Sequence, residues 1–145
     1  MAFKLNLSEK SGKTWKMESE SESFIDKEIN QKIKGEEIRP DLTGYEFEIT
    51  GASDKSGFAH FKEVSGIGLK KLLLGYGKGM KKRPKREGKK KRSNYKPKGL
   101  RLRKTVRGNT ISSATSQINL KVLKEGKTPL IKIFGPKEEA SVNKE

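Results

Sequence analysis

A dense run of cationic side chains in the second half of the chain is the feature best suited to chemistry. Residues 78–107 hold 16 Lys or Arg and one acidic residue, Glu87, whereas the whole sequence holds 34 basic and 18 acidic residues. Clustered positive charges repel one another, and a polyanion relieves that repulsion while it releases its own condensed counterions. The charge distribution therefore indicates a nucleic acid as the partner.

The expected contacts divide between a loop and a strand. Residues 78–99 are rich in Gly, Pro and Lys and hold too little apolar surface to fold alone. In this segment Arg can bind a phosphate through two parallel hydrogen bonds, Lys acts more as a point charge, and Tyr95 offers a ring on which an unpaired base can stack. The predicted RNA-binding residues are Lys78, Lys81, Lys82, Arg83, Lys85, Arg86, Lys89, Lys90, Lys91, Arg92, Tyr95, Lys96, Lys98, Arg101, Arg103, Lys104 and Arg107.

Three arginines continue this positive charge onto a predicted strand. Arg101, Arg103 and Arg107 alternate with Leu102 and Val106, so the arginines share one strand face. A strand holds its side chains in place better than a loop does, and no acidic residue shares that face in the sequence. Phosphate contact is therefore favoured over a face that is merely solubilised by charge.

Other residues that could take part in catalysis or metal binding lack the partners that this chemistry requires. The sequence has no cysteine, which excludes disulfides and thiolate metal sites. His60 has no nucleophile or metal-binding partners and is predicted to be structural or a surface contact. The glycines of residues 75–79 lack the spacing of a phosphate-binding loop, and Glu46 and Glu48 belong on a solvated strand face. We therefore expect no enzyme, cofactor, metal ion or small-molecule substrate.

Short strands joined by turns account for most of the remaining sequence. Apolar and polar residues alternate in residues 3–7, 14–18, 45–49 and 118–122, which is typical of half-buried strands. Residues 69–74 form a short apolar run beside glycines and are predicted to be a buried strand.

One helix is predicted in residues 23–35. Ser23 is a suitable N-cap, the apolar residues that follow share one face, and Gly35 ends the pattern. A last short apolar element follows at residues 130–134. Together the elements predict a mainly β fold, a small β-barrel of short strands with one short helix and a long basic extension.

The length of 145 residues and the apolar content of 30% suit one modest core with extensions. We predict four segments: residues 1–77 as the N-terminal part of the barrel body, 78–99 as the basic extended loop, 100–134 as the returning strands, and 135–145 as a flexible tail. No run approaches the roughly 20 apolar residues that span a bilayer, and the start lacks a secretory signal. A cytoplasmic location without membrane contact is expected.

Four motifs, each weak alone, together resemble one protein family over nearly the whole chain. They are FKLNLS at residues 3–8, GASDKSGF at 51–58, GIGLKKLLLGYGKG at 66–79 and GLRLRKTVRGNTIS at 99–112. Their order and spacing resemble those of the sixth small-subunit ribosomal protein of archaea and eukaryotes, which is unrelated to the bacterial protein of the same number. RKTVRG at residues 103–108 is the most specific of them.

The resemblance implies a β-barrel body and a structural role in the cytoplasmic small ribosomal subunit, at one copy per subunit. It also implies contact with small-subunit ribosomal RNA through the basic loop and the following strand, and with neighbouring ribosomal proteins. The form KGLRLRK resembles archaeal members, and the tail has no counterpart of the long basic C-terminal helix of eukaryotic members. Their phosphorylation switch is therefore not transferred to Ser112, Ser113 or Ser141.

Two departures and one alternative accompany this interpretation. Ala59 and His60 stand where Pro-Met is usual in the family, and Ala52 stands where a second Gly is common. Composition alone also allows a free nucleic-acid-binding protein, such as an RNA chaperone or a DNA-compacting protein, which the number of copies per small subunit would distinguish. A solvated tail or targeting signal is disfavoured, because a targeting signal needs only about 5–8 basic residues.

Overall fold

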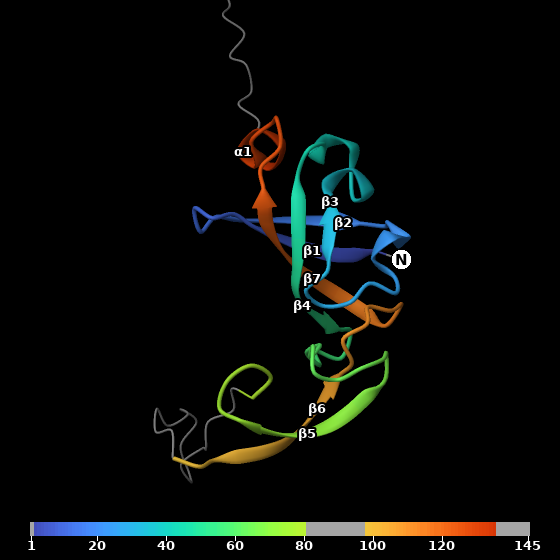
Figure 1. Ribbon diagram of the computed structural model, residues 1–145, viewed down its shortest axis with the longest axis vertical. Helices are drawn as coiled ribbons and strands as arrows, with labels where there is room; N and C mark the ends of the chain where they lie inside the picture. The colour runs from blue at the N-terminus through green and yellow to red at the C-terminus, as the bar shows by residue number, and fades with distance from the viewer. Residues whose placement is uncertain (1, 81–97, 136–145) are drawn as a thin grey trace, which may run out of the picture.

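The structure, a computed structural model, describes residues 2–80 and 98–135. Its elements are the strands β1 (Phe3–Ser8), β2 (Thr14–Ser19), β3 (Lys32–Lys34), β4 (Glu46–Asp54), β5 (Leu69–Gly75), β6 (Arg101–Arg107) and β7 (Thr115–Lys124), and the helix α1 (Leu130–Phe134). Five strands form one sheet in the order β2-β1-β7-β4-β3, while β5 and β6 form a separate ribbon (Figure 1). Within the sheet β1 and β7 pair in parallel, and the other neighbours pair antiparallel.

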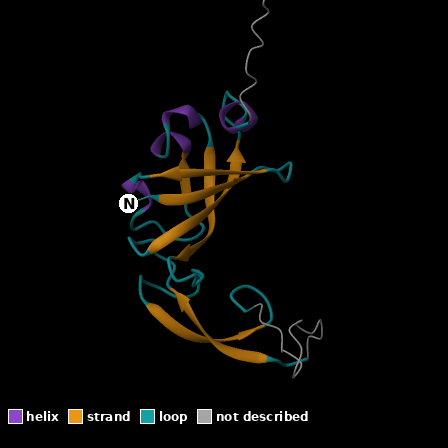
Figure 2. Ribbon diagram, turned by 180° about the vertical axis from the view of Figure 1, so that it is seen from behind, coloured by secondary structure: helices purple, strands orange, loops and turns teal. Residues whose placement is uncertain are grey.

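The predicted mainly β class with one short helix is confirmed, but the sheet does not close into a barrel. β2 and β3 are its two edges and do not pair with each other. β3 has only three residues, and β5 and β6 leave the sheet instead of extending it. Too little strand remains to join the edges, so 3-10 turns and connecting loops cover the core instead (Figure 2).

The main core lies against one face of the five-stranded sheet. Strand alternation places Leu5, Ile49 and Leu120 on this face, where each is fully buried. Phe24, from the first 3-10 turn, is also fully buried, and its ring meets that of Phe3 edge to face with the centroids 5.9 Å apart. Burial of each such side chain contributes about 1.5–3 kcal/mol, so this body provides most of the hydrophobic stabilisation.

The prediction of a helix in residues 23–35 is wrong. A 3-10 turn at Glu22–Phe24 is followed by non-helical chain and then by β3. Asp26 and Asn30 have φ values of 64° and 73°, in the left-handed region that a right-handed helix excludes. The backbone N–H of Asn30 donates to the carbonyl of Ile49 at 2.8 Å, so tertiary hydrogen bonds replace a helical ladder. In the described ranges the α-helix is α1, where the sequence indicated only a short apolar element.

β5 and β6 form an antiparallel ribbon that extends away from the sheet (Figure 1). The register pairs Leu69 with Arg107 at the end of the ribbon nearest the sheet. The strand predicted at residues 69–74 is confirmed, but its predicted burial is wrong, because Leu69 and Leu73 are 49% and 53% exposed. A two-stranded ribbon leaves one face without a covering layer, which the local apolar pattern does not reveal.

Candidate nucleic-acid interface

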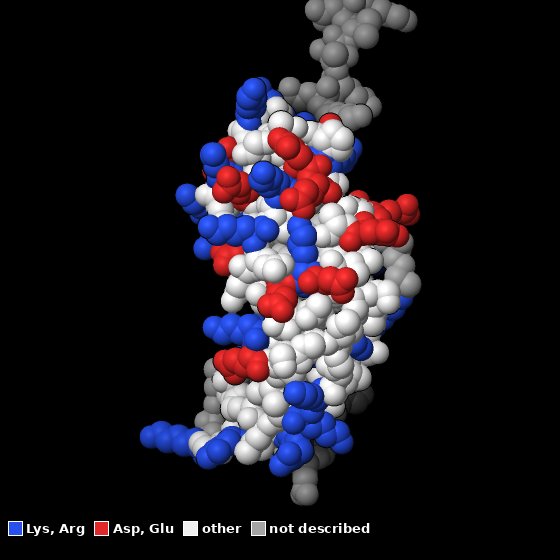
Figure 3. Space-filling view, turned by 45° about the vertical axis from the view of Figure 1, so that its right-hand side comes forward, with Lys and Arg blue, Asp and Glu red and all other residues white. Residues whose placement is uncertain are grey.

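The predicted basic loop joins the two strands of the ribbon. Eleven of the predicted contacts lie in residues 81–97, outside the described ranges, and so does the tail from residue 136. The loop, the tail and the four predicted segments therefore stay predictions. Figure 3 shows Lys and Arg gathered at the lower end of the molecule, where the ribbon lies, and acidic side chains mixed with basic ones over the sheet. The predicted contacts in the described ranges are Lys78, Lys98, Arg101, Arg103, Lys104 and Arg107.

Arg101 and Arg103 are exposed on β6, beside Gly75 and Leu73 of β5. The ion pairs found within the described residues involve neither arginine. Their charges are therefore available to an outside partner, and the strand fixes the points from which the side chains start. Because an Arg can hold a phosphate through two parallel hydrogen bonds, these two residues are well placed to bind phosphate.

Arg107 has a different role, although it lies on the same strand face. Its Nε donates to Oδ2 of Asp54 at 3.0 Å, and its Nη1 donates to the carbonyl of Ile67 at 3.0 Å. The two charged side chains are 14% and 2% exposed. The face therefore does hold an acidic partner, which the sequence did not indicate. Arg107 anchors β6 to the body, and only the rest of its guanidinium is open to a phosphate.

Asp54 also fixes the turn that follows β4. Its Oδ1 accepts the backbone N–H of Phe58 at 2.8 Å, and its own N–H donates to the carbonyl of Phe58 at 3.0 Å. Aspartate commonly closes turns in this way, because its short side chain reaches a backbone N–H a few residues on. One buried carboxylate thus joins the end of β4, the turn over residues 54–58 and Arg107 of β6.

His60 completes the junction between the sheet and the ribbon. The imidazole is fully buried, with Nδ1 at 2.7 Å from the carbonyl oxygen of Gly108 and Nε2 at 3.2 Å from Oγ1 of Thr115. A carbonyl only accepts, so Nδ1 carries the hydrogen and Nε2 accepts from the hydroxyl. Gly108 has no room for a side chain, because a Cβ would lie 1.8 Å from the carbonyl oxygen of Gly66. Of the two roles predicted for His60, structural or surface contact, its full burial agrees with the structural one and not with a surface contact.

The comparisons with known proteins point to one family. The model of the family described as Ribosomal protein S6e matches residues 3–135. The chain belongs to the ribosomal protein S6e family. That membership confirms the resemblance drawn from the four motifs and the predicted residence with the ribosome in the cytoplasm. The family is one of ribosomal proteins and not of enzymes.

Three archaeal relatives cover between 80% and 96% of the chain, in agreement with the predicted archaeal-like form. A Methanococcus maripaludis C6 protein is 42% identical over 131 residues, covering 90% of this chain and 94% of its own. A Methanothermobacter thermautotrophicus protein is 40% identical over 142 residues, covering 96% of this chain and 100% of its own. An Archaeoglobus fulgidus protein is 42% identical over 118 residues, covering 80% and 79%. Each of these relatives is named small ribosomal subunit protein eS6.

Two motifs of this S6e-family chain meet at the junction. GASDKSGF provides Asp54, and RKTVRG provides Arg107 with Gly108 after it. The departures at Ala59 and His60 lie at the same junction, where the carbonyl of Ala59 accepts the backbone N–H of Arg107 at 3.0 Å. Sequence reasoning missed Asp54; the available signal was an aspartate that opens a glycine-containing turn.

The single histidine of this S6e-family chain should make stability depend on pH. Burial lowers the pKa of His60 from its ordinary 6.5, and the positive charge of Arg107 lowers that pKa further. Below about pH 6.5 the unfolded chain therefore binds more protons than the folded one, so stability falls as the pH drops through that value. Urea titrations from pH 7 to pH 5.5 should show this decrease, and His60→Gln should remove it. An equal slope of stability against pH in the variant would show that His60 is not the source of the pH dependence.

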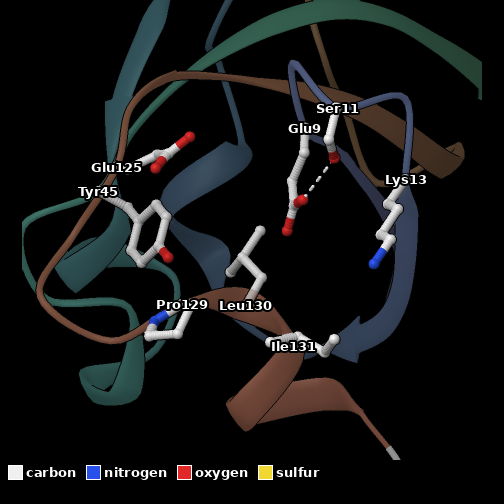
Figure 4. Close-up of a pocket in the computed structure, with 8 residues that line it drawn as sticks. All are labelled: Glu9, Ser11, Lys13, Tyr45, Glu125, Pro129, Leu130 and Ile131. Atoms are coloured by element: carbon white, nitrogen blue, oxygen red, sulfur yellow. Dashed lines mark hydrogen bonds between the residues drawn. The ribbon is translucent and has the colours of Figure 1, made fainter.

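A pocket at the other end of the S6e body offers no catalytic set. It has a volume of about 220 Å³ and lies between the β1–β2 turn and α1 (Figure 4). The hydroxyl of Tyr45 donates to the carbonyl of Thr128 at 2.6 Å, and Glu9 accepts from Ser11 and Trp15, both at 2.8 Å. Burial, together with nearby carboxylates, raises the pKa of Tyr45, so this hydroxyl stays protonated and is no base.

The described residues contain neither a group of side chains suited to a metal ion nor a helix suited to crossing a membrane. No three His, Cys, Asp or Glu side chains are grouped there in a way that could hold a metal ion. None of the helices in residues 2–80 and 98–135 has the length and apolar content needed to cross a membrane.

Proposed function

We propose that this chain is a structural component of the small ribosomal subunit that binds small-subunit ribosomal RNA through the basic loop and β6. The observation that carries the proposal is the position of Arg101 and Arg103, which are exposed and outside any ion pair of the described residues. They stand on an ordered strand next to a segment that holds eleven of the predicted contacts. The two arginines of the ordered strand β6 thus lie next to the cationic segment at the free end of the ribbon.

The mechanism is neutralisation of phosphates, without a chemical step. The sheet body holds the ribbon through the pair between Arg107 and Asp54, and the ribbon presents Arg101 and Arg103 to the RNA. The basic loop is predicted from its composition not to fold alone, and ordering such a segment on RNA costs roughly 1–2 kcal/mol per residue in backbone entropy. Many phosphate contacts must offset this cost, whereas strand residues are already ordered and require less. The strand is therefore the natural starting point for RNA contact, and the basic loop adds further contacts.

Sedimentation tests the proposal directly. A native lysate of the source cells is run on gradients at low and high salt, and the fractions are probed for this chain. We expect co-migration with the small subunit at one copy per subunit, beside neighbouring ribosomal proteins. Migration in the light fractions, or with DNA, would overturn the proposal in favour of a free nucleic-acid-binding protein.

A further inference from the structure

A cavity of about 330 Å³ lies where the turn after β4 meets the outer edge of β6. Phe58 and Ala59 line one side of it, and Arg103, Lys104 and Thr105 line the other. The volume corresponds to about ten water molecules at roughly 30 Å³ each. The cavity therefore has room for one planar base, but not for a paired helix.

The backbone of β6 offers hydrogen-bonding groups to this cavity. Arg107 donates its backbone N–H to Ala59 and accepts from that of Phe61, both at 3.0 Å, so its peptide groups point away from β5. In an antiparallel pair this direction alternates along the strand, which gives Thr105 and Arg103 the same outward orientation. Within the described ranges no strand pairs with that edge at these two positions, so a backbone donor and an acceptor are open at each.

The residues that line the cavity include one with an aromatic ring and two cations. Phe58 is half-buried, and its backbone is fixed by two hydrogen bonds with Asp54. Arg103 is exposed and Lys104 half-buried, and neither takes part in an ion pair of the described residues. A ring face, an open strand edge and positive charge correspond to the three parts of a nucleotide: the base plane, the base edge and the phosphate.

We propose that this cavity holds one unpaired nucleotide of the ribosomal RNA. Its base stacks on the ring of Phe58 and pairs by its edge with the open backbone groups of Thr105. Its phosphates lie against Arg103 and Lys104. The inference rests on the proposed function and adds to it a specific subsite, formed by the turn after β4 and by β6, with Gly79 at the start of the basic loop also lining it.

A polypeptide strand is the other partner that an open strand edge can take. Here the open edge is short, because Arg107 is already paired with Ala59 on that side. An added strand would gain few hydrogen bonds, whereas a base needs only one donor and one acceptor. The two flanking cations also favour a phosphate. The geometry therefore points to a nucleotide.

The test compares the affinities of purified variants for deproteinised small-subunit ribosomal RNA over a range of salt concentrations. Base stacking on an aromatic side chain supports a loss of about 5- to 100-fold for Phe58→Leu. Stacking releases no counterions, so the slope of log affinity against log salt should not change. Lys104→Gln should instead make the slope shallower by about 1. Phe134→Leu is the matched control and should bind like the parent chain, because Phe134 is half-buried in α1 and does not line the cavity.

The outcomes separate this inference from the proposed function. If the parent chain does not bind the RNA, both are overturned. If the parent binds and Phe58→Leu binds equally well, the nucleotide subsite is overturned while RNA binding by the basic loop stands. A melting temperature for each variant shows whether a lost affinity reflects lost folding.

A second measurement needs no variant. Ultraviolet irradiation of native small subunits joins stacked bases to the aromatic rings that they touch. Trypsin cleaves after Lys55 and Lys62 and releases residues 56–62. We expect a single-nucleotide adduct on Phe58 in this peptide. A subunit that contains the chain but gives no adduct there, or a cross-link from this peptide to another protein, would overturn the subsite.

Discussion

We expect Asp54→Ala to lower the free energy of unfolding by about 3–5 kcal/mol, measured by urea titration at pH 7. The carboxylate is 2% exposed and pairs with Arg107, whose side chain is 14% exposed. Removing one partner leaves a largely buried guanidinium without its counter-charge. The substitution also removes the acceptor for the backbone N–H of Phe58, so the turn after β4 loses its closing hydrogen bond.

Three further variants separate the two functions of Asp54. Asp54→Asn keeps an oxygen that can accept the N–H of Phe58 but removes the charge, so its loss should be smaller than that of Asp54→Ala. Arg107→Met should be costly alone, since it leaves the carboxylate buried and unpaired. Combining Asp54→Ala with Arg107→Met should cost less than the sum of the two single changes. Strict additivity, or a loss below about 1 kcal/mol for Asp54→Ala, would show that the pair does not hold the junction.

The pair of Asp54 and Arg107 also illustrates which parts of the fold could be predicted from the sequence and which could not. Alternation in residues 3–7 and 118–122 correctly predicted strands, because a half-buried sheet imposes a period of two on the sequence itself. The pairing of Arg107 with Asp54 links residues 53 positions apart and has no local signature. It emerges only when β4 and β6 are brought together.

Two of the three departures from the predicted fold, the helix and the buried strand, have the same origin. The apolar spacing of residues 23–35 suits a helix, but left-handed backbone at Asp26 and Asn30 directs the chain into hydrogen bonds with distant segments. The apolar residues at 69–74 suit a buried strand, but burial depends on how many layers cover a strand. The periodicity of a segment depends on its own side chains and carries no information about the segments that pack against it. Tertiary contacts therefore determined both the backbone of residues 23–35 and the exposure of residues 69–74.

Of the candidate interface, the charged residues could be predicted from the sequence but the cavity could not. Charged residues can be counted directly in a sequence. The cationic segment, with Arg101 and Arg103 beside it, could therefore be identified without knowledge of the fold. The cavity beside Phe58 could not, because its walls come from β6 and from the turn after β4. Only the folded junction shows that a ring, a strand edge and two cations adjoin one another.

Deleting residues 81–92 should leave a folded protein that binds ribosomal RNA roughly 1,000-fold more weakly at 0.1 M salt. The deletion removes nine Lys or Arg and one acidic residue, and residues 93–97 remain to join the strands of the ribbon. If about half of the 16 cations in residues 78–107 meet phosphates, log affinity should fall with log salt at a slope of about −6 to −7. The deletion should bring that slope to about −3, and both slopes are measured by titrating RNA at several salt concentrations.

The design must separate charge from chain length. Replacing the same nine cations with Ser keeps the length and should weaken binding as much as the deletion does, because the lost energy comes from counterion release. Shortening the loop to about half its length lowers the entropic cost of closing it by only about 0.6 kcal/mol, so the melting temperature should stay the same or rise slightly. A slope shallower than about −2 for the intact chain would exclude the basic loop as the main binder. An unfolded deletion variant would instead show that the loop belongs to the folded body.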